Sequence, residues 1–299
     1  MKASPLLNTK FMPPPVEDAL PRPHLIQWLD GQHDRRLVLV SAPPGYGKTT
    51  LLSNFLAVHS GPSAWYQLEA SDSDPTVFLT YLIEAIRRSS WKKAAKLGQN
   101  AQALLNSPEA GMASQRVLTV LINELNEQVS ERFVIVLEDY HVIASPVVHQ
   151  LVDYLLDNAP TALQLIISTR ADPPLALARL RARGLLAELR AADLRFRNNE
   201  VTELFKRETH GLSTENLSLL GEKTEGWAAG LQIVRNTLAG QNAIATREII
   251  ASLSGSHRFV FEYLTEEVFR RLPQEKQNLA LSLLVLPQWL QYKGIKKHL

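Results

Sequence analysis

The sequence has 299 residues, of which 45% are hydrophobic and 21% are charged, a balance typical of globular proteins with ample material for a core. Lys and Arg number 32 against 30 Asp and Glu, so a nucleic-acid-binding surface does not dominate the chain. The absence of cysteine excludes disulfides, thiolate zinc sites and cysteine nucleophiles. No segment reaches the roughly 18 apolar residues that span a bilayer, and the first residues lack the apolar stretch of a signal peptide. We therefore expect a cytoplasmic protein with no membrane partner.

The first part of the chain predicts a proline-rich arm followed by alternating strands and helices. Residues 1–36 are read as an extended arm that ends in a short helix at 23–29. Apolar runs predict buried strands at residues 37–40, 64–68, 133–137 and 163–169. Helical spacing is found at residues 48–58, 74–88, 117–129 and 147–158, and the alanine-rich stretch 89–113 is also expected to be helical. This alternation predicts an α/β fold with a parallel sheet and helices on both faces.

Beyond residue 198 the strand patterns stop. Helical periodicity continues at residues 200–208, 214–225, 228–239, 247–253 and 258–271. We therefore expect an arm at 1–36, a core at 37–198, an all-helical subdomain at 199–254, and a separate small helical region at 255–299.

Residues 42–49 fit the Walker A pattern of phosphate-binding loops, with Ala42 in place of the usual first glycine. A loop between a strand and a helix turns backbone N–H groups and the positive end of the helix dipole toward phosphates. Lys48 would reach the β- and γ-phosphates, and the Thr49 hydroxyl would ligate Mg²⁺. The nucleotide contacts expected from the loop are Pro44, Gly45, Tyr46, Gly47, Lys48, Thr49 and Thr50. A chance match is the alternative, but a buried strand and an amphipathic helix flank the motif, as a phosphate loop requires.

The apolar run at 133–137 ends in two carboxylates, Glu138 and Asp139. A phosphate loop needs such an acidic partner on a neighbouring strand to help hold the metal ion. One carboxylate would ligate Mg²⁺ while the other polarises the attacking water, and the sequence leaves open which does which. The alternative is a solvated acidic turn after a core strand.

Arg170 follows the strand predicted at 163–169. In P-loop proteins with an additional strand between the two Walker elements, this place senses the γ-phosphate, which Arg170 would do through a charge-assisted contact. Alternatively, Arg170 pairs with Glu138 or Asp172.

These segments resemble the ATPase module of MalT-like, LuxR-type regulators, a branch of the STAND class of P-loop ATPases. The resemblance extends from about residue 7 to 286. Beside the phosphate loop, its motifs are Pro21-Arg22-Pro23, Ser73-Asp74-Pro75 and residues 137–141, 168–175, 180–184, 188–190, 194–196 and 224–231.

The resemblance implies a P-loop core followed by a helical subdomain and a winged helix. It also implies a switch that is closed with ADP and that opens and self-associates when ATP and an inducer are bound. Arg22 would lie near the adenine, although His24 departs from a common arginine beside it. Trp227 either contacts the nucleotide or packs as a core aromatic beside glycine.

Residues 287–299 do not continue the resemblance, which therefore ends inside the expected winged helix. We interpret the chain as a truncated member, a fragment or a shifted reading frame, without sensor repeats or a DNA-binding helix-turn-helix. Direct DNA binding is therefore not expected. The arginines at 179, 181 and 183 bind nucleic acid or, as we favour, form a solvated or internally paired helix face.

Two functions compete on the sequence alone. The first is a regulatory ATPase that binds ATP or ADP with Mg²⁺, hydrolyses ATP slowly and self-associates in the ATP state. The second is a non-enzymatic ATP- or ADP-binding interaction module that pairs with a full-length homologue. A small-molecule kinase is a third reading, for which the sequence offers no substrate-binding lid.

Overall fold

The computed structural model describes residues 6–16, 19–91, 94–107, 114–206, 212–238 and 250. The chain divides into two compact units, Met1–Arg195 and Phe196–Leu299. The expected winged-helix region at 255–299 lies outside the described residues, as do the helices predicted at 258–271 and, apart from Ile250, at 247–253. The domain limits taken from the sequence stay predictions.

The first unit contains a five-stranded sheet in the order β2-β3-β4-β1-β5, in which every neighbouring pair is parallel. Its strands are β1 (Leu37–Ser41), β2 (Ser63–Gln67), β3 (Phe133–Glu138), β4 (Leu163–Thr169) and β5 (Leu186–Arg190). The predicted α/β fold with a parallel sheet is confirmed. Of the five strands, β5 is the one that the sequence reading missed.

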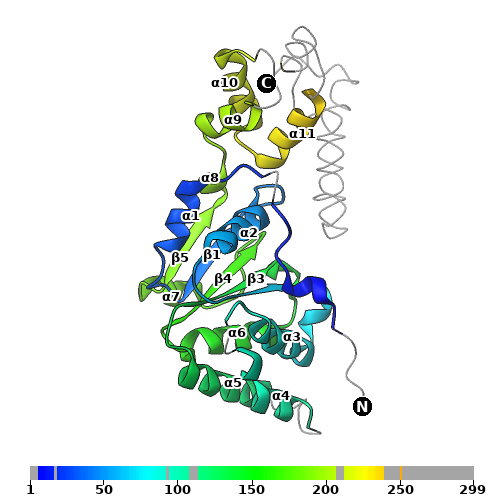
Figure 1. Ribbon diagram of the computed structural model, residues 1–299, viewed down its shortest axis with the longest axis vertical. Helices are drawn as coiled ribbons and strands as arrows, with labels where there is room; N and C mark the ends of the chain where they lie inside the picture. Colours follow the sequence, from blue (N-terminus) through cyan, green and yellow to red (C-terminus); the bar gives the residue numbers. More distant parts are fainter. Residues whose placement is uncertain are drawn as a thin grey trace, which may run out of the picture. The chain divides into compact units, whose positions relative to one another are not determined.

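Helices pack on both faces of this sheet (Figure 1). They are α1 (Pro23–Asp30), α2 (Lys48–Val58), α3 (Pro75–Arg87), α4 (Gln99–Leu105), α5 (Ser114–Gln128), α6 (Pro146–Asn158), α7 (Leu177–Ala182) and α8 (Ala191–Leu194). Short 3₁₀ turns lie at η1 (Asn8–Phe11), η2 (Ala70–Ser73), η3 (Ala94–Lys96) and η5 (Tyr140–Val142). The stretch 89–113, expected to be helical, forms only η3 and α4 within its described part.

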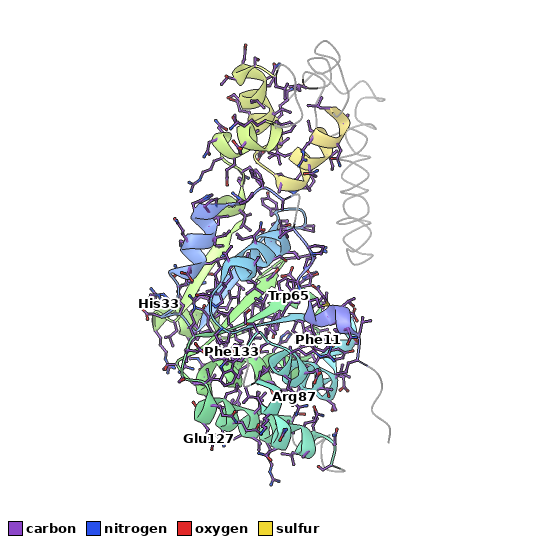
Figure 2. The ribbon with its side chains drawn as sticks, in the orientation of Figure 1. Phe11, His33, Trp65, Arg87, Glu127 and Phe133 are labelled. Atoms are coloured by element: carbon purple, nitrogen blue, oxygen red, sulfur yellow. The ribbon has the colours of Figure 1, made fainter. Side chains whose placement is uncertain are left out.

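Alternation along the strands divides the interior into two cores. Phe133, Ile135 and Leu137 of β3 face the larger core, which α3 to α6 cover, and Phe133 is labelled in Figure 2. Val134 and Val136 of the same strand face the smaller core beneath α1 and α2. Each strand therefore contributes to both cores, which explains why the central strands are mostly apolar on both faces.

The arm is held to the first unit by a buried ion pair. Lys10 is 2% exposed, and its Nζ donates hydrogen bonds of 2.7 and 2.6 Å to the two carboxylate oxygens of Asp72, which is fully buried. The same ammonium lies 4.1 Å from the ring centre of Tyr81, and Phe11 stacks on that ring at 5.5 Å. The arm, expected to be extended, therefore contains a packed turn at Asn8–Phe11, which no pattern in the sequence predicted.

The second unit is helical in its described part, with α9 (Asn198–Phe205), α10 (Thr214–Thr224) and α11 (Ala228–Leu238). Trp227 packs against the start of α11: a Cβ atom at Gly230 would lie only 2.7 Å from Trp227 Cε3. Gly226 has a positive φ of 66° and its carbonyl accepts a 2.8 Å hydrogen bond from Phe196 N. These contacts favour the interpretation of Gly226-Trp227 as a packing motif of this unit.

Within the described residues, none of the helices is both long and apolar enough to cross a membrane.

Candidate functional site

The phosphate loop joins β1 to α2 at the carboxyl edge of the sheet. Gly45 and Gly47 have φ angles of 79° and 75°, in the left-handed region where a side chain causes strain. Gly47 directly precedes Lys48, the first residue of α2. The loop therefore needs both glycines to bring its backbone N–H groups to the start of the helix, which is the geometry of an anion-binding site.

Lys48 is 7% exposed, and its Nζ donates hydrogen bonds to the carbonyl oxygens of Ala42 at 2.7 Å and Pro43 at 3.1 Å. Burial lowers the pKa of Lys48 below its usual value, and the positive charge of Arg170 acts in the same direction. The carboxylates of Glu138 and Asp139 oppose this shift of the pKa. The charges of the three predicted catalytic residues, Glu138, Asp139 and Arg170, therefore all act on Lys48.

Glu138, the last residue of β3, lies against the phosphate loop. It is fully buried, and its Oε1 accepts a 2.5 Å hydrogen bond from the Thr49 hydroxyl. Its Oε2 is also buried, and the nearby Ser168 hydroxyl lowers the pKa of Glu138. Burial raises the pKa of Glu138 to about 7; the Thr49 hydrogen bond lowers it, and the nearby Asp139 charge raises it. Two of the three candidate metal ligands, Thr49 and Glu138, therefore come together across 89 residues of sequence.

Asp139 follows directly and turns out of the strand with a φ of 59°, a left-handed conformation that Asp tolerates better than most residues. Its Oδ2 accepts a 3.0 Å hydrogen bond from Nε2 of Gln67, and its Oδ1 lies 3.6 Å from Nδ1 of His141. Gln67 was not singled out in the sequence. The signal that points to it is positional, because it ends β2 in register with Glu138.

The remaining predicted residues lie at different parts of the unit. Arg22 is 6% exposed, and its guanidinium donates to the carbonyls of Leu194 at 2.7 Å and Arg195 at 2.8 Å. It thus joins the arm to the segment after β5, and its contact with adenine stays a prediction. Within the loop, Pro44, Gly45 and Tyr46 are partly exposed, as is Thr50 in the first turn of α2.

A second group of polar residues lies at the ends of β1 and β5, which the sequence reading also missed. Arg190, the last residue of β5, forms ion pairs with Asp172 and Glu188, and Asp172 approaches the Ser41 hydroxyl at 3.5 Å. Hydrogen bonding to Arg190 lowers the pKa of Asp172 below its usual value. This group connects the end of β1, which leads into the phosphate loop, to the segment that follows Arg170.

The arginines of α7 are internally paired. Arg179 contacts Asp157 at 2.6 Å, and Arg181 makes two 3.0 Å hydrogen bonds to Glu188. These pairs support the interpretation of this helix face as internally paired rather than as a nucleic-acid-binding surface.

The polar groups at this edge of the sheet suit a Mg²⁺ ion held together with phosphate. The Thr49 hydroxyl and the Glu138 carboxylate meet, and the second carboxylate oxygen of Glu138 is buried beside them. Across the described part of the chain, three or more His, Cys, Asp or Glu side chains do not gather into a metal site. Mg²⁺ is commonly held by one or two carboxylates with phosphate and water, so a full protein cage is not required.

Known proteins that are similar to this chain include ATPase domains and transcriptional regulators. Residues 24–168 match the family described as the AAA ATPase domain. The chain is 30% identical over 273 residues to the HTH-type transcriptional regulator MalT of Vibrio cholerae, and 31% identical over 274 residues to MalT of Yersinia enterocolitica. Each match covers 91% of this chain but 29% of the relative, so the chain spans about three tenths of their length.

Among solved structures, a Walker-type ATPase of Pyrococcus abyssi is similar at a TM-score of 0.48 with 16% identity, over 86% of this chain and 78% of that one. The family match covers β1 to β4 with the phosphate loop, and the MalT matches extend over nearly the whole chain. The resemblance read from the sequence motifs is thereby confirmed: the chain is similar to MalT regulators over 91% of its length, and residues 24–168 match the AAA ATPase domain.

Proposed function

We propose that this chain is the nucleotide-dependent regulatory module of a transcriptional regulator, which binds ATP or ADP with Mg²⁺ and hydrolyses ATP slowly. The observation that carries the proposal is the 2.5 Å hydrogen bond between Thr49 and Glu138. It places the expected Mg²⁺ ligand of the phosphate loop directly on the acidic end of β3. The transcriptional role follows from the similarity to MalT regulators.

Each residue of the site has a separate proposed role in binding or hydrolysing the nucleotide. Backbone N–H groups from Gly45 to Thr49 would hold the phosphates, with Lys48 supplying a positive charge. Thr49 and Glu138 would hold Mg²⁺, which neutralises the charge on the phosphates when bound. Asp139, oriented by Gln67, would polarise the attacking water.

Arg170 would complete the site as a γ-phosphate contact, since its charge already acts on Lys48. A module that reads the γ-phosphate distinguishes ATP from ADP. We propose that this difference controls self-association or pairing with a full-length homologue, and that the chain itself does not contact DNA.

The test is binding of labelled ATP and ADP, followed by single-turnover hydrolysis, with Lys48→Ala and Asp139→Asn as variants. Lys48→Ala should weaken nucleotide binding at least tenfold, whereas Asp139→Asn should retain binding and lose turnover. Lys96→Ala, which changes an exposed lysine far from the loop in sequence, is the matched control and should behave as the parent.

Three outcomes separate the competing functions. Binding with slow turnover supports the regulatory ATPase. Binding without turnover in the folded parent protein supports the non-enzymatic module. A folded chain that binds neither nucleotide contradicts both.

A further inference from the structure

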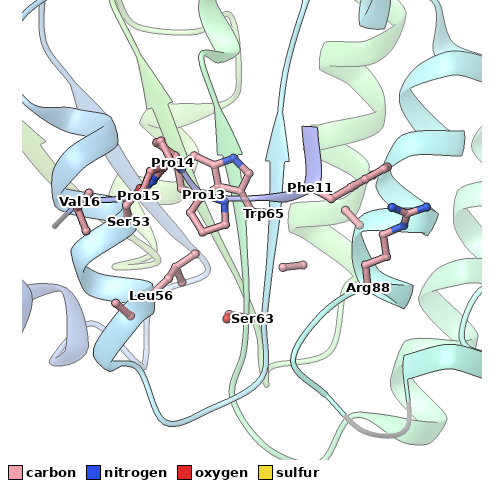
Figure 3. Close-up of a pocket in the computed structure, with 13 residues that line it drawn as sticks. Phe11, Pro13, Pro14, Pro15, Val16, Ser53, Leu56, Ser63, Trp65 and Arg88 are labelled. Atoms are coloured by element: carbon pink, nitrogen blue, oxygen red, sulfur yellow. The ribbon is translucent and has the colours of Figure 1, made fainter. Parts of the chain in front are cut away.

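Asp172 is held by the ends of two strands at the carboxyl edge of the sheet, beside the phosphate loop. Both terminal nitrogens of Arg190, the last residue of β5, donate to its two carboxylate oxygens, Nη2 to Oδ2 at 3.2 Å. The Ser41 hydroxyl, at the end of β1, approaches Oδ1 at 3.5 Å. A carboxylate bound by two nitrogens of one arginine is fixed in orientation as well as in place. The pocket in Figure 3 is a separate feature, lined by residues of the arm, α2, β2 and α3.

Arg190 is supported in turn by the sheet and by α7. Its guanidinium also donates to Glu188, which accepts two 3.0 Å hydrogen bonds from Arg181 of α7. Within the sheet, Arg190 is in register with Ser41 of β1. Asp172 is therefore attached to two strands that are already paired with each other, so its support is rigid.

The segment that Asp172 holds carries Arg170, the proposed γ-phosphate contact. Thr169, the residue before it, ends β4, and its carbonyl accepts a 3.2 Å hydrogen bond from the N–H of Ala42 at the start of the phosphate loop. The Thr169 hydroxyl donates to the Ala171 carbonyl at 2.7 Å. Arg170 thus lies between two fixed points, the end of β4 and Asp172, and a shift of Asp172 would move its backbone.

The ion pair that fixes Asp172 is open to solvent. The side chain of Asp172 is 53% exposed and that of Arg190 is 36% exposed. Exposed ion pairs contribute little to the stability of a whole domain, because water and salt screen them. A change at Asp172 should therefore leave the protein folded, which allows its effect on Arg170 to be measured separately.

We propose that Asp172 is a positioning residue for Arg170. Held by Arg190 and Ser41, it fixes residues 170–172 beside the phosphate loop so that Arg170 contacts the γ-phosphate. This inference rests on the proposed nucleotide function and deepens it, because it names a residue that sets the discrimination between ATP and ADP. ADP has no γ-phosphate, so loss of the Asp172 carboxylate weakens binding of ATP and spares ADP.

The sign of the effect separates this role from a simple effect of charge. Asp172→Asn removes a negative charge from the edge of the sheet where the phosphates would lie. If the carboxylate acted through its charge alone, its removal would favour ATP, which is more negative than ADP. If the carboxylate positions Arg170, its removal disfavours ATP.

The experiment measures equilibrium binding of ADP and of the non-hydrolysable ATP analogue adenylyl imidodiphosphate, both with Mg²⁺, to the whole chain. Arg170→Ala should weaken binding of the analogue about tenfold or more, the effect of a lost charge-assisted hydrogen bond. Asp172→Asn should weaken it about three- to tenfold, and both variants should bind ADP within about twofold of the parent. In the double variant, Asp172→Asn should add less than about twofold to Arg170→Ala, because no side chain is left to position.

Two further variants test the geometry. Arg190→Lys keeps the positive charge but loses the planar fork of donors, and should weaken binding of the analogue about two- to fivefold. Asp157→Asn is the matched control, since it breaks another exposed ion pair, with Arg179 at 2.6 Å, and should leave both affinities unchanged. The thermal unfolding midpoints of all variants should lie within about 4 °C of the parent.

Two results would overturn the proposal while the nucleotide function stands. One is an affinity for the ATP analogue that Asp172→Asn leaves unchanged or raises. The other is an equal loss from Asp172→Asn in the parent and in Arg170→Ala, which would mean that Asp172 does not act through Arg170. A folded parent that binds neither nucleotide contradicts the proposed function itself, and this inference with it.

Discussion

Gln67 and Asp139 meet at the ends of two adjacent parallel strands, where the Gln67 side-chain amide donates a 3.0 Å hydrogen bond to the Asp139 carboxylate. Asp139 has left the strand in a left-handed conformation, so this bond helps to fix where its carboxylate lies. The interaction joins the edge strand of the sheet to the residue that we expect to polarise water.

Replacing Gln67 with leucine keeps most of the side-chain volume and removes this donor. Turnover should fall about three- to tenfold, the effect of one lost hydrogen bond, while nucleotide affinity changes less than twofold. Single-turnover hydrolysis and equilibrium binding, measured on the same samples, provide the comparison. Gln115→Leu, on the exposed face of α5, is the matched control. Equal losses of binding and turnover would show that Gln67 supports the site in general and not Asp139 in particular.

Thr49 offers a second test, because serine keeps its hydroxyl and valine keeps its shape. Thr49→Ser should retain Mg²⁺-dependent nucleotide binding, and Thr49→Val should weaken it about tenfold or more. The valine variant also leaves buried Glu138 without its hydrogen bond, which should cost about 1–3 kcal/mol in the free energy of unfolding. Nucleotide titrations with and without Mg²⁺ and urea unfolding measure the two effects. Retained Mg²⁺ dependence in Thr49→Val would remove this residue from the expected ligand set.

The buried pair of Lys10 and Asp72 should dominate the attachment of the arm. Lys10→Met leaves the fully buried Asp72 carboxylate uncompensated, and breaking such a pair costs about 3–5 kcal/mol. The double variant Lys10→Met/Asp72→Leu should lose much less than the sum of the single changes, because neither charge is then left alone. Urea unfolding of all three variants measures this coupling, with Lys96→Met as an exposed control. Additive losses would mean that the two residues act independently.

His149 should make the protein less stable in acid. Burial lowers its pKa below 6.5, with the Asp153 charge opposing, and its Nδ1 lies 3.0 Å from the Tyr140 hydroxyl. As the pH falls through about 6.5, the unfolded chain takes up a proton that the folded histidine resists, so stability is lost on acidification. His149→Gln keeps a hydrogen-bonding group that does not titrate in this range.

The measurement is the free energy of unfolding at pH 7 and pH 5 for the parent and for His149→Gln. The difference between the two pH values should be smaller in the variant. A difference of the same size in both proteins would assign the acid sensitivity to other groups.

Most of the sheet could be predicted because its central strands face helices on both sides. β1, β3 and β4 are buried at every position, so their sequences are mostly apolar and are bounded by turns. β5 has only alternate positions buried and includes Glu188 and Arg190, so its five residues carry too weak a pattern to separate from the neighbouring turns.

The residues of the candidate site could be predicted where one continuous motif fixes the backbone geometry. Residues whose contacts come from distant parts of the sequence were harder to predict. The phosphate loop is one continuous segment, and its glycines are required by the backbone. Gln67 and Lys10 depend instead on which strands and turns become neighbours, and nothing near them in the sequence records their partners. The roles of the site residues in binding and turnover remain predictions for the experiments above.

The strand order also has a consequence for synthesis of the chain. β1, which leads into the phosphate loop, pairs only with β4 and β5, and β4 begins at Leu163. At about 5–20 residues per second, the ribosome takes roughly 6–24 s to pass from the end of β1 to the start of β4. During that interval β1, apolar at four of its five positions, has no partner strand, and chaperones have time to bind it. The phosphate loop is thus among the first segments to be made and among the last to be completed.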